Sequence, residues 1–562
     1  MLRQARFALG FILAAATGAT GLPAAADGLA GAYLAGRQAS IASDYQEAAR
    51  YFARALMRDR DNPVLMESAA LAFLGMGDIA QAYPIALKLI DLDPRNQVAS
   101  LVLAADTLGP EGDIDAELPS VGPAADGLIE AWRALDRGET DEAFAAFDAL
   151  IEDRRLQGFG TYHKALALAQ VGDFEGADAL LSADGGEAAF FTRRGILAHA
   201  QVMSQLGRFD EASLLIAESL GTEDPRLRGL IADLASETPV PFDIAPTPQA
   251  GYAEVFYTVA MALSGQAADA FTLLYARVAQ HISPGHVDAI LLAAELLEEL
   301  EQYDLANKAY DKVPRDDPAF LTAEIGRANV LRADDKGDAA IEVLRQLTET
   351  HSDVGFVHTA LGDALRRMER FEESADAYDQ AIAMISAESP RDWVLYYARG
   401  IAHERIDDWD AAESDLRKAL ELNPGQPMVL NYLGYSFLEL GTNFDEAMGM
   451  IEEAVAARPD NGYITDSLGW GLYRLGRFEE AVAPMEKAVE LEPLDPIIND
   501  HLGDVYYAVG RKLEAEFQWR RALSFDPEPE EAERIRRKLD VGLDQVLIEE
   551  GEEPVSVANE EG

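Results

Sequence analysis

The chain has 562 residues, 49% of them hydrophobic, and contains no cysteine. This composition is ample for a folded protein, whereas the absence of cysteine excludes disulfides and thiolate metal sites. The formal net charge of -52 argues against nucleic acid or anionic lipid as a partner, because both require a basic surface.

Residues 1–26 have the pattern of an export signal. Arg3 and Arg6 precede an apolar run over residues 7–16, and small residues follow at 24–26. This order of charge, apolar run and small residues is typical of a cleaved signal peptide. The run is shorter than the roughly 20 residues that a membrane span needs. We therefore expect an exported, soluble, periplasmic protein without a membrane span or a lipid-bearing cysteine.

Between residues 27 and 353, short fragments recur that lead from a turn into an alanine. Examples are GDIAQA ending at Ala82, GDFEGA ending at Ala177 and GRFDEA ending at Ala212. Glycine can end one helix, and the alanine allows the next helix to pack closely. The predicted segments are degenerate helical repeats at 27–107, 128–238 and 252–353, a loop at 108–127 and a proline-rich linker at 239–251.

A much clearer repeat covers residues 354–527. Five glycines that open the same pattern follow one another at intervals of 38, 34, 35 and 34 residues: Gly362, Gly400, Gly434, Gly469 and Gly503. In the copy that begins at Gly462, Gly469 and Ala481 are small where two antiparallel helices come closest. Gly476 can end the first helix, and Pro493 ends the second. A period near 34 indicates stacked helix pairs.

The segment after the repeats changes composition. Residues 528–548 are expected to form a capping helix whose basic cluster, including Arg534 and Lys538, is a solvated face or a small anionic docking patch. Residues 549–562 are acidic and lack aromatic residues, so we predict a disordered tail.

The pattern over residues 354–527 resembles the tetratricopeptide repeat (TPR) family, and the run from Asn431 to Leu523 is similar to exported proteobacterial members. The resemblance implies an all-α fold: a right-handed TPR superhelix, or α-solenoid, of antiparallel helix pairs. Each pair is then expected to bury its apolar stripe only against its neighbours. It also implies a non-enzymatic scaffold of the cell envelope that binds a protein in its concave groove.

The resemblance further implies that positions 2, 5, 9 and 12 of each first helix face that groove. Aromatic side chains there offer large contact areas, although helical aromatics more often pack in cores. The Lys and Asn set that clamps a terminal carboxylate in some members is missing, which argues against binding of a free C-terminus. The predicted partner-binding residues are Tyr397, Asn431, Tyr435, Tyr463, Asp466, Trp470, Tyr473, Asp500, Asp504 and Tyr507.

The sequence contains no recognisable catalytic motif. Its 8 histidines are scattered, and no HExxH, P-loop or GxSxG motif is present, so we predict no catalytic, metal or cofactor site. One alternative is an envelope hydrolase or peptidoglycan-modifying factor built around residues 106–246, where the repeats are weakest. Another is a self-assembling structural protein. The partner's identity and the oligomeric state stay open, although the acidity favours a basic partner.

Overall fold

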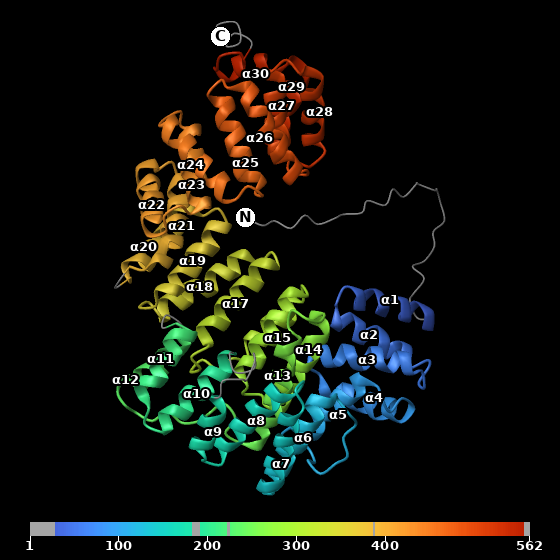
Figure 1. The fold of residues 1–562 in the computed structure, drawn as a ribbon. Helices are drawn as coiled ribbons and strands as arrows, with labels where there is room; N and C mark the ends of the chain where they lie inside the picture. The colour runs from blue at the N-terminus through green and yellow to red at the C-terminus, as the bar shows by residue number, and fades with distance from the viewer. Residues whose placement is uncertain (1–27, 183–191, 222–224, 386–387, 556–562) are drawn as a thin grey trace. The chain divides into compact units, whose positions relative to one another are not determined.

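The computed structural model describes residues 28–182, 192–221, 225–385 and 388–555. This part of the chain contains thirty α-helices and no strand, which confirms the all-α prediction (Figure 1). The predicted signal peptide lies outside the described residues. The chain divides into two compact units, residues 1–340 (unit 1) and 341–562 (unit 2).

The helices of unit 1 form antiparallel pairs along most of its length. They are α1 (Leu29–Ile41), α2 (Tyr45–Leu56), α3 (Pro63–Met76), α4 (Ile79–Leu92), α5 (Gln97–Thr107), α6 (Pro123–Asp136), α7 (Thr140–Glu152), α8 (Gln157–Gln170), α9 (Phe174–Leu181), α10 (Arg193–Gln205), α11 (Phe209–Ser219), α12 (Arg228–Ala235), α13 (Pro248–Leu263), α14 (Asp269–Ile282), α15 (Val287–Glu299), α16 (Tyr303–Tyr310) and α17 (Phe320–Ala333). The next helix, α18 (Gly337–Thr350), contains the boundary between the units.

Unit 2 repeats one helix pair five times and ends in two further helices. The first helices of the pairs are α19 (Gly355–Arg367), α21 (Trp393–Glu404), α23 (Pro427–Glu439), α25 (Gly462–Arg474) and α27 (Pro496–Ala508). The second helices are α20 (Phe371–Ala383), α22 (Trp409–Leu422), α24 (Phe444–Ala457), α26 (Phe478–Leu491) and α28 (Lys512–Leu523). The terminal helices are α29 (Pro529–Val541) and α30 (Leu543–Glu550).

The predicted small residues stand where the two helices of a pair touch. A Cβ atom on Gly469 would lie 2.2 Å from Sδ of Met485, and one on Gly503 would lie 2.4 Å from the indole of Trp519. Gly476 has the left-handed φ of 70° that ends α25, as the sequence predicts. The recurring glycines therefore stand at the positions where the two helices of a pair touch.

Unit 1 does not stack only on sequence neighbours. Helix α13 packs against α6 and α8, and α14 packs against α3 and α5, so this pair covers first helices from much earlier in the chain (Figure 1). Tyr252 of α13 donates a hydrogen bond to Asp136 at 3.0 Å, and Gln97 of α5 donates to the Tyr275 hydroxyl at 3.0 Å. Because residues 108–122 form no helix, α5 has no following second helix, and α14 packs beside it instead.

Several predicted boundaries differ from the structure. The loop expected at 108–127 ends where α6 begins, and the linker expected at 239–251 ends where α13 begins, each at a proline suited to a first helical turn. The single capping helix is in fact two, broken at Gly542 with a φ of 86°. The described part of the predicted disordered tail is ordered, because α30 reaches Glu550 and Val555 is buried in the core.

Candidate protein-binding surface

The predicted site residues of unit 2 lie on one face of each first helix. On α25, Tyr463, Asp466, Trp470 and Tyr473 are spaced by three or four residues, which aligns their side chains along that helix. Each first helix contacts the next one, and α21 meets α23 through the rings of Tyr397 and Tyr432, so these faces lie side by side. The structure therefore brings the predicted residues together, but most of them are covered by the neighbouring repeat.

Trp470 is a packing residue rather than an exposed anchor. Its indole stacks on Tyr473 at 4.8 Å between ring centroids and on His501 of α27 at 4.0 Å. Its Nε1 donates a hydrogen bond to Glu439 at the end of α23, at 2.8 Å. Trp470 thus joins three successive first helices, and its 8% exposure corrects the prediction that it faces an open groove. Tyr473 is buried with it.

The predicted carboxylates also pair within the protein. Asp466 accepts a hydrogen bond from His501 Nδ1 at 3.1 Å. Burial disfavours the imidazolium, but the negative charges of Asp466, Asp500 and Asp504 and the hydrogen bond to Asp466 together raise the pKa of His501. Asp504 accepts hydrogen bonds from Trp519 Nε1 at 2.9 Å and from Lys538 Nζ at 2.7 Å. Both carboxylates are therefore buried contacts between repeats.

Lys538 corrects the expectation of a solvated basic face after the repeats. Its side chain is buried, and its ammonium group lies 2.7 Å from carboxylate oxygens of both Asp500 and Asp504. Sequence reasoning missed this contact because α29 and α27 are brought together by packing. A lysine that follows the last repeat at the spacing of a new first helix is the signal that could have indicated it.

The remaining predicted residues are half-buried at the contacts between first helices. The rings of Tyr397 and Tyr432 meet edge to face at 5.9 Å. The Tyr507 hydroxyl donates a hydrogen bond to Asp544 of α30 at 3.0 Å. Burial raises the pKa of Tyr435 far above its ordinary value. Oδ1 of Asn431 has no hydrogen-bond donor among the described residues, so this amide can accept a further hydrogen bond.

One row of side chains on this face is exposed and apolar. The second residue of each of the five first helices contributes to it, and we call these residues the apolar row: Phe356, Val394, Met428, Tyr463 and Ile497, exposed by 38%, 50%, 39%, 51% and 44%. Of these five residues, sequence reasoning named only Tyr463. An apolar residue at the same position of every repeat was the signal for the other four.

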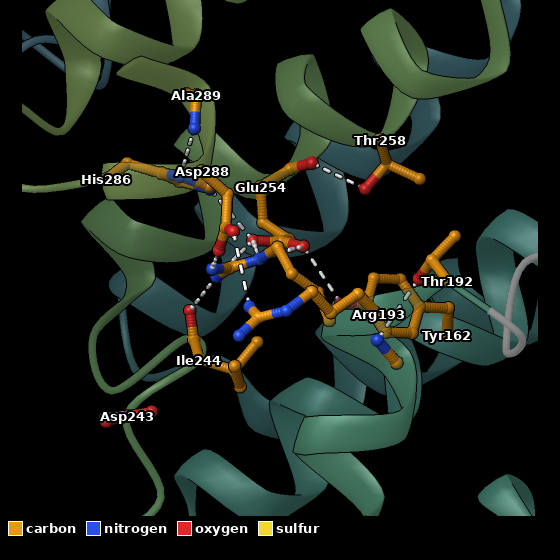
Figure 2. Close-up of polar contacts among 12 residues, drawn as sticks. Tyr162, Thr192, Arg193, Asp243, Ile244, Glu254, Thr258, His286, Asp288 and Ala289 are labelled. Atoms are coloured by element: carbon orange, nitrogen blue, oxygen red, sulfur yellow. Dashed lines mark hydrogen bonds and ion pairs between the residues drawn. The ribbon is translucent and has the colours of Figure 1, made fainter. Parts of the chain in front are cut away.

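Unit 1 contains a buried polar cluster centred on Glu254 (Figure 2). Its members Tyr162 and Arg194 lie within residues 106–246, where a hydrolase site was the alternative, whereas the central carboxylate lies outside that range. Glu254 of α13, exposed by only 1%, accepts hydrogen bonds from Tyr162 of α8 at 2.9 Å, from Arg194 of α10 at 3.0 Å and from His286 at 3.1 Å. Arg194 also pairs with Asp288 of α15 at 2.6 Å. The cluster therefore ties four helices together.

The protonation states of this cluster follow from its contacts. Nδ1 of His286 accepts a hydrogen bond from the backbone N–H of Ala289, so Nε2 carries the proton donated to Glu254. Burial opposes ionisation of Glu254, but the charge of Arg194 and the hydrogen bond from His286 hold its pKa far below the usual range. A buried carboxylate so fully occupied is suited to holding helices in place rather than to acid–base chemistry.

The described residues contain neither a candidate metal-binding cluster nor a candidate membrane-spanning helix. No group of three or more His, Asp or Glu side chains in those ranges could hold a metal ion. No helix in the same ranges has both the length and the apolar composition to cross a membrane.

Comparison with known proteins gives the class of the repeats. The tetratricopeptide repeat family model matches residues 325–390, 359–427, 397–462 and 467–528. A TPR repeat-containing protein of Pseudomonas aeruginosa is 29% identical over 180 residues, which are 32% of this chain and 30% of that protein. The general transcriptional corepressor ssn6 of Schizosaccharomyces pombe is 24% identical over 26% of this chain and 13% of its own length. The chain thus spans less than a third of either relative.

One similar solved structure is the APC/C hetero-tetramer Cut9–Hcn1. The alignment covers 91% of this chain and 96% of the matched chain, with 14% sequence identity and a TM-score of 0.39. The family matches and the helix pairs agree that the chain carries tetratricopeptide repeats over residues 325–462 and 467–528. Its repeats imply the role of a scaffold for protein–protein contacts.

Proposed function

We propose that this chain is a non-enzymatic scaffold of the bacterial cell envelope that holds a segment of a partner protein on the first-helix face of unit 2. The apolar row is the observation that carries this proposal. Exposed apolar side chains at one position of five consecutive repeats form a contact line that internal packing does not use. In unit 1, by contrast, α13 and α14 cover the first helices α3, α5, α6 and α8.

The spacing of the apolar row favours an extended partner segment. Packed helices lie about 8–10 Å apart, and a polyproline II segment rises about 3.1 Å per residue with three residues per turn. A residue at every third position of such a segment therefore recurs about every 9 Å on one side. We expect a segment with apolar residues at that spacing, which lies across the first helices.

Charge favours basic residues in that segment. The chain carries a net charge of -52. Within the row, the carboxylates of Asp495 and Glu492 interact electrostatically with the Tyr463 hydroxyl. Lysine or arginine between the apolar positions would be attracted to these carboxylates and would speed association.

A periplasmic location is part of the proposal and is supported by the signal pattern of residues 1–26 and by the resemblance to exported proteins. Cell fractionation of the tagged full chain tests it. We expect the protein in the periplasmic fraction, and a version lacking residues 1–26 in the cytoplasm. No observation favours the hydrolase alternative, because the polar cluster at Glu254 is buried and its contacts are internal.

The apolar row can be tested by replacing Met428, Tyr463 and Ile497 together by aspartate. We expect partner capture in in-cell crosslinking with mass spectrometry to fall about tenfold or more, because charges replace apolar contacts. The matched control replaces Leu513 and Phe517 of α28, exposed by 83% and 66%, by aspartate and should leave capture unchanged. Equal loss in both variants, or loss in neither, would contradict a binding surface at the apolar row.

A further inference from the structure

Arg277 of α14 is a buried cation without a carboxylate partner. It is exposed by only 3%, and no ion pair among the described residues includes it. Its Nε donates a hydrogen bond to the carbonyl oxygen of Gly75 at 3.1 Å, and its Nη1 donates to Oε1 of Gln280 at 2.8 Å. Burial lowers the pKa of Arg277 to about 10. Burying an unpaired charge is costly, yet none of the 99 acidic residues in the chain forms an ion pair with this guanidinium among the described residues.

Two more hydrogen-bond donors beside Arg277 have no acceptor in the described part of the chain. The Tyr45 hydroxyl and Nε2 of Gln280 are both fully buried and without a partner, in residues exposed by 4% and 6%. The amide of Gln280 is oriented by Arg277, because Oε1 must accept the guanidinium hydrogen bond and Nε2 is then left as a donor.

Gly75 brings the phenol and the guanidinium together. The ring of Tyr45 packs so closely on Gly75 that a Cβ atom there would lie 2.5 Å from it, and the carbonyl of the same residue accepts the hydrogen bond from Arg277. The electrostatic interaction between Tyr45 and Arg277 agrees with this proximity. The three donors therefore come from α2 and α14 around the end of α3.

The local charge is positive. Lys312, just after α16, has its pKa lowered by burial and then by the charge of Arg277. The carboxyl end of α3 offsets part of this charge, since a helix terminus carries about half an elementary charge. That offset is incomplete, and it satisfies neither the Tyr45 hydroxyl nor Nε2 of Gln280.

We propose that Arg277, Tyr45 and Gln280 bind a small inorganic anion such as chloride, which acts as the counter-ion of the guanidinium. Hydrogen-bond donors and a cation are what an anion requires, and the burial of the donor atoms restricts the ligand to small ions. The anion holds α14 against α2 and α3, so it stabilises the helix pair that fills the first-helix face of unit 1. This role is independent of partner binding by unit 2.

Thermal unfolding of the full chain in sodium chloride and in sodium gluconate at equal ionic strength tests the proposal. Gluconate screens charges equally but is too large to enter. We expect the first unfolding midpoint to be about 2–4 °C higher in chloride, with saturation, and hydrogen exchange in α14 to be slower. Equal midpoints and equal exchange in the two salts would overturn the proposal.

Two variants separate anion binding from a general salt effect. Gln280→Glu supplies a carboxylate to Arg277 in place of the anion, so its midpoint should be high in gluconate and insensitive to chloride. Tyr45→Phe removes one donor with little change in shape and should reduce the chloride shift at least twofold. A full chloride shift retained in both variants would show that the anion acts elsewhere and would refute the site.

Discussion

Replacing Arg194 by methionine is expected to destabilise unit 1 by about 3–5 kcal/mol at neutral pH, because it leaves buried carboxylates without their cation. Glu254 accepts two hydrogen bonds from Arg194, and Asp288 pairs with the same guanidinium. Methionine has similar volume, so the loss would come from charge rather than from a cavity. Urea unfolding followed by circular dichroism, with hydrogen exchange in α13, measures the effect.

The penalty of Arg194→Met should depend on pH in a defined direction. In the native protein the pKa of Glu254 is held far below the ordinary value of 4.5, so this carboxylate contributes stability above that value. Without Arg194, burial favours the protonated form and raises the pKa of Glu254 above its unfolded value. The variant therefore loses stability as pH rises through that raised pKa, and the difference from the native protein shrinks toward pH 4.5.

The double variant Arg194→Met with Glu254→Gln is the matched control. It removes both partners of the contact between Arg194 and Glu254. Asp288 retains its ion pair with Arg193, whose Nη1 lies 3.6 Å from Oδ1 of Asp288. We expect the double variant to be more stable at pH 7 than Arg194→Met alone, since an uncompensated buried charge costs more than a missing pair. Single and double variants of equal stability, or a penalty that does not change with pH, would argue against a charge-paired cluster.

The helix pairs of residues 354–527 could be predicted because each depends on local chemistry. Gly469 must be small where Met485 crosses it, Gly476 must adopt a left-handed φ, and both requirements recur with the period of the repeat. The turn is harder to predict where the left-handed residue is not glycine. Glu369 and Asp407 take left-handed φ values of 60° and 63° at equivalent turns. Repeats with such turns are harder to recognise from the sequence.

The contacts of α13 and α14 could not be predicted, because they join segments far apart in the chain. Nothing in the spacing of residues indicates that Tyr162 meets Glu254, or that Arg277 meets Gly75. A periodic sequence predicts contacts between neighbours, whereas these two pairings join residues that are 92 and 202 positions apart. The weak repeat pattern of unit 1 follows from this, since its side chains pack against more than their own neighbours.

The predicted binding residues illustrate the same limit within unit 2. Position in the helix places Tyr463 and Trp470 on one face, but the exposure of each side chain depends on the next repeat. His501 of α27 stacks on Trp470, whereas Tyr463 lies about two turns earlier on α25 and stays half exposed. A stretch of sequence identifies the face, and the neighbouring repeat decides which of its residues a partner can reach.

Trp470→Ala is accordingly expected to destabilise unit 2 by about 3–5 kcal/mol, as is usual for a buried tryptophan that is truncated. The variant loses the stacking on His501 and the hydrogen bond to Glu439, and it opens a cavity between α23, α25 and α27. Tyr463→Ala on the same helix is the control and should change the free energy of unfolding by less than about 1 kcal/mol. Urea unfolding of both variants measures the difference.

Partner capture separates the two roles on this face. Trp470→Ala should reduce capture only in proportion to the loss of folded unit 2, whereas Tyr463→Ala should weaken capture while unit 2 stays folded. If Trp470→Ala instead abolished capture with an unchanged free energy of unfolding, the indole would have to contact the partner directly. The buried position between Tyr473 and His501 would then be wrong, and the apolar row would no longer be the contact line.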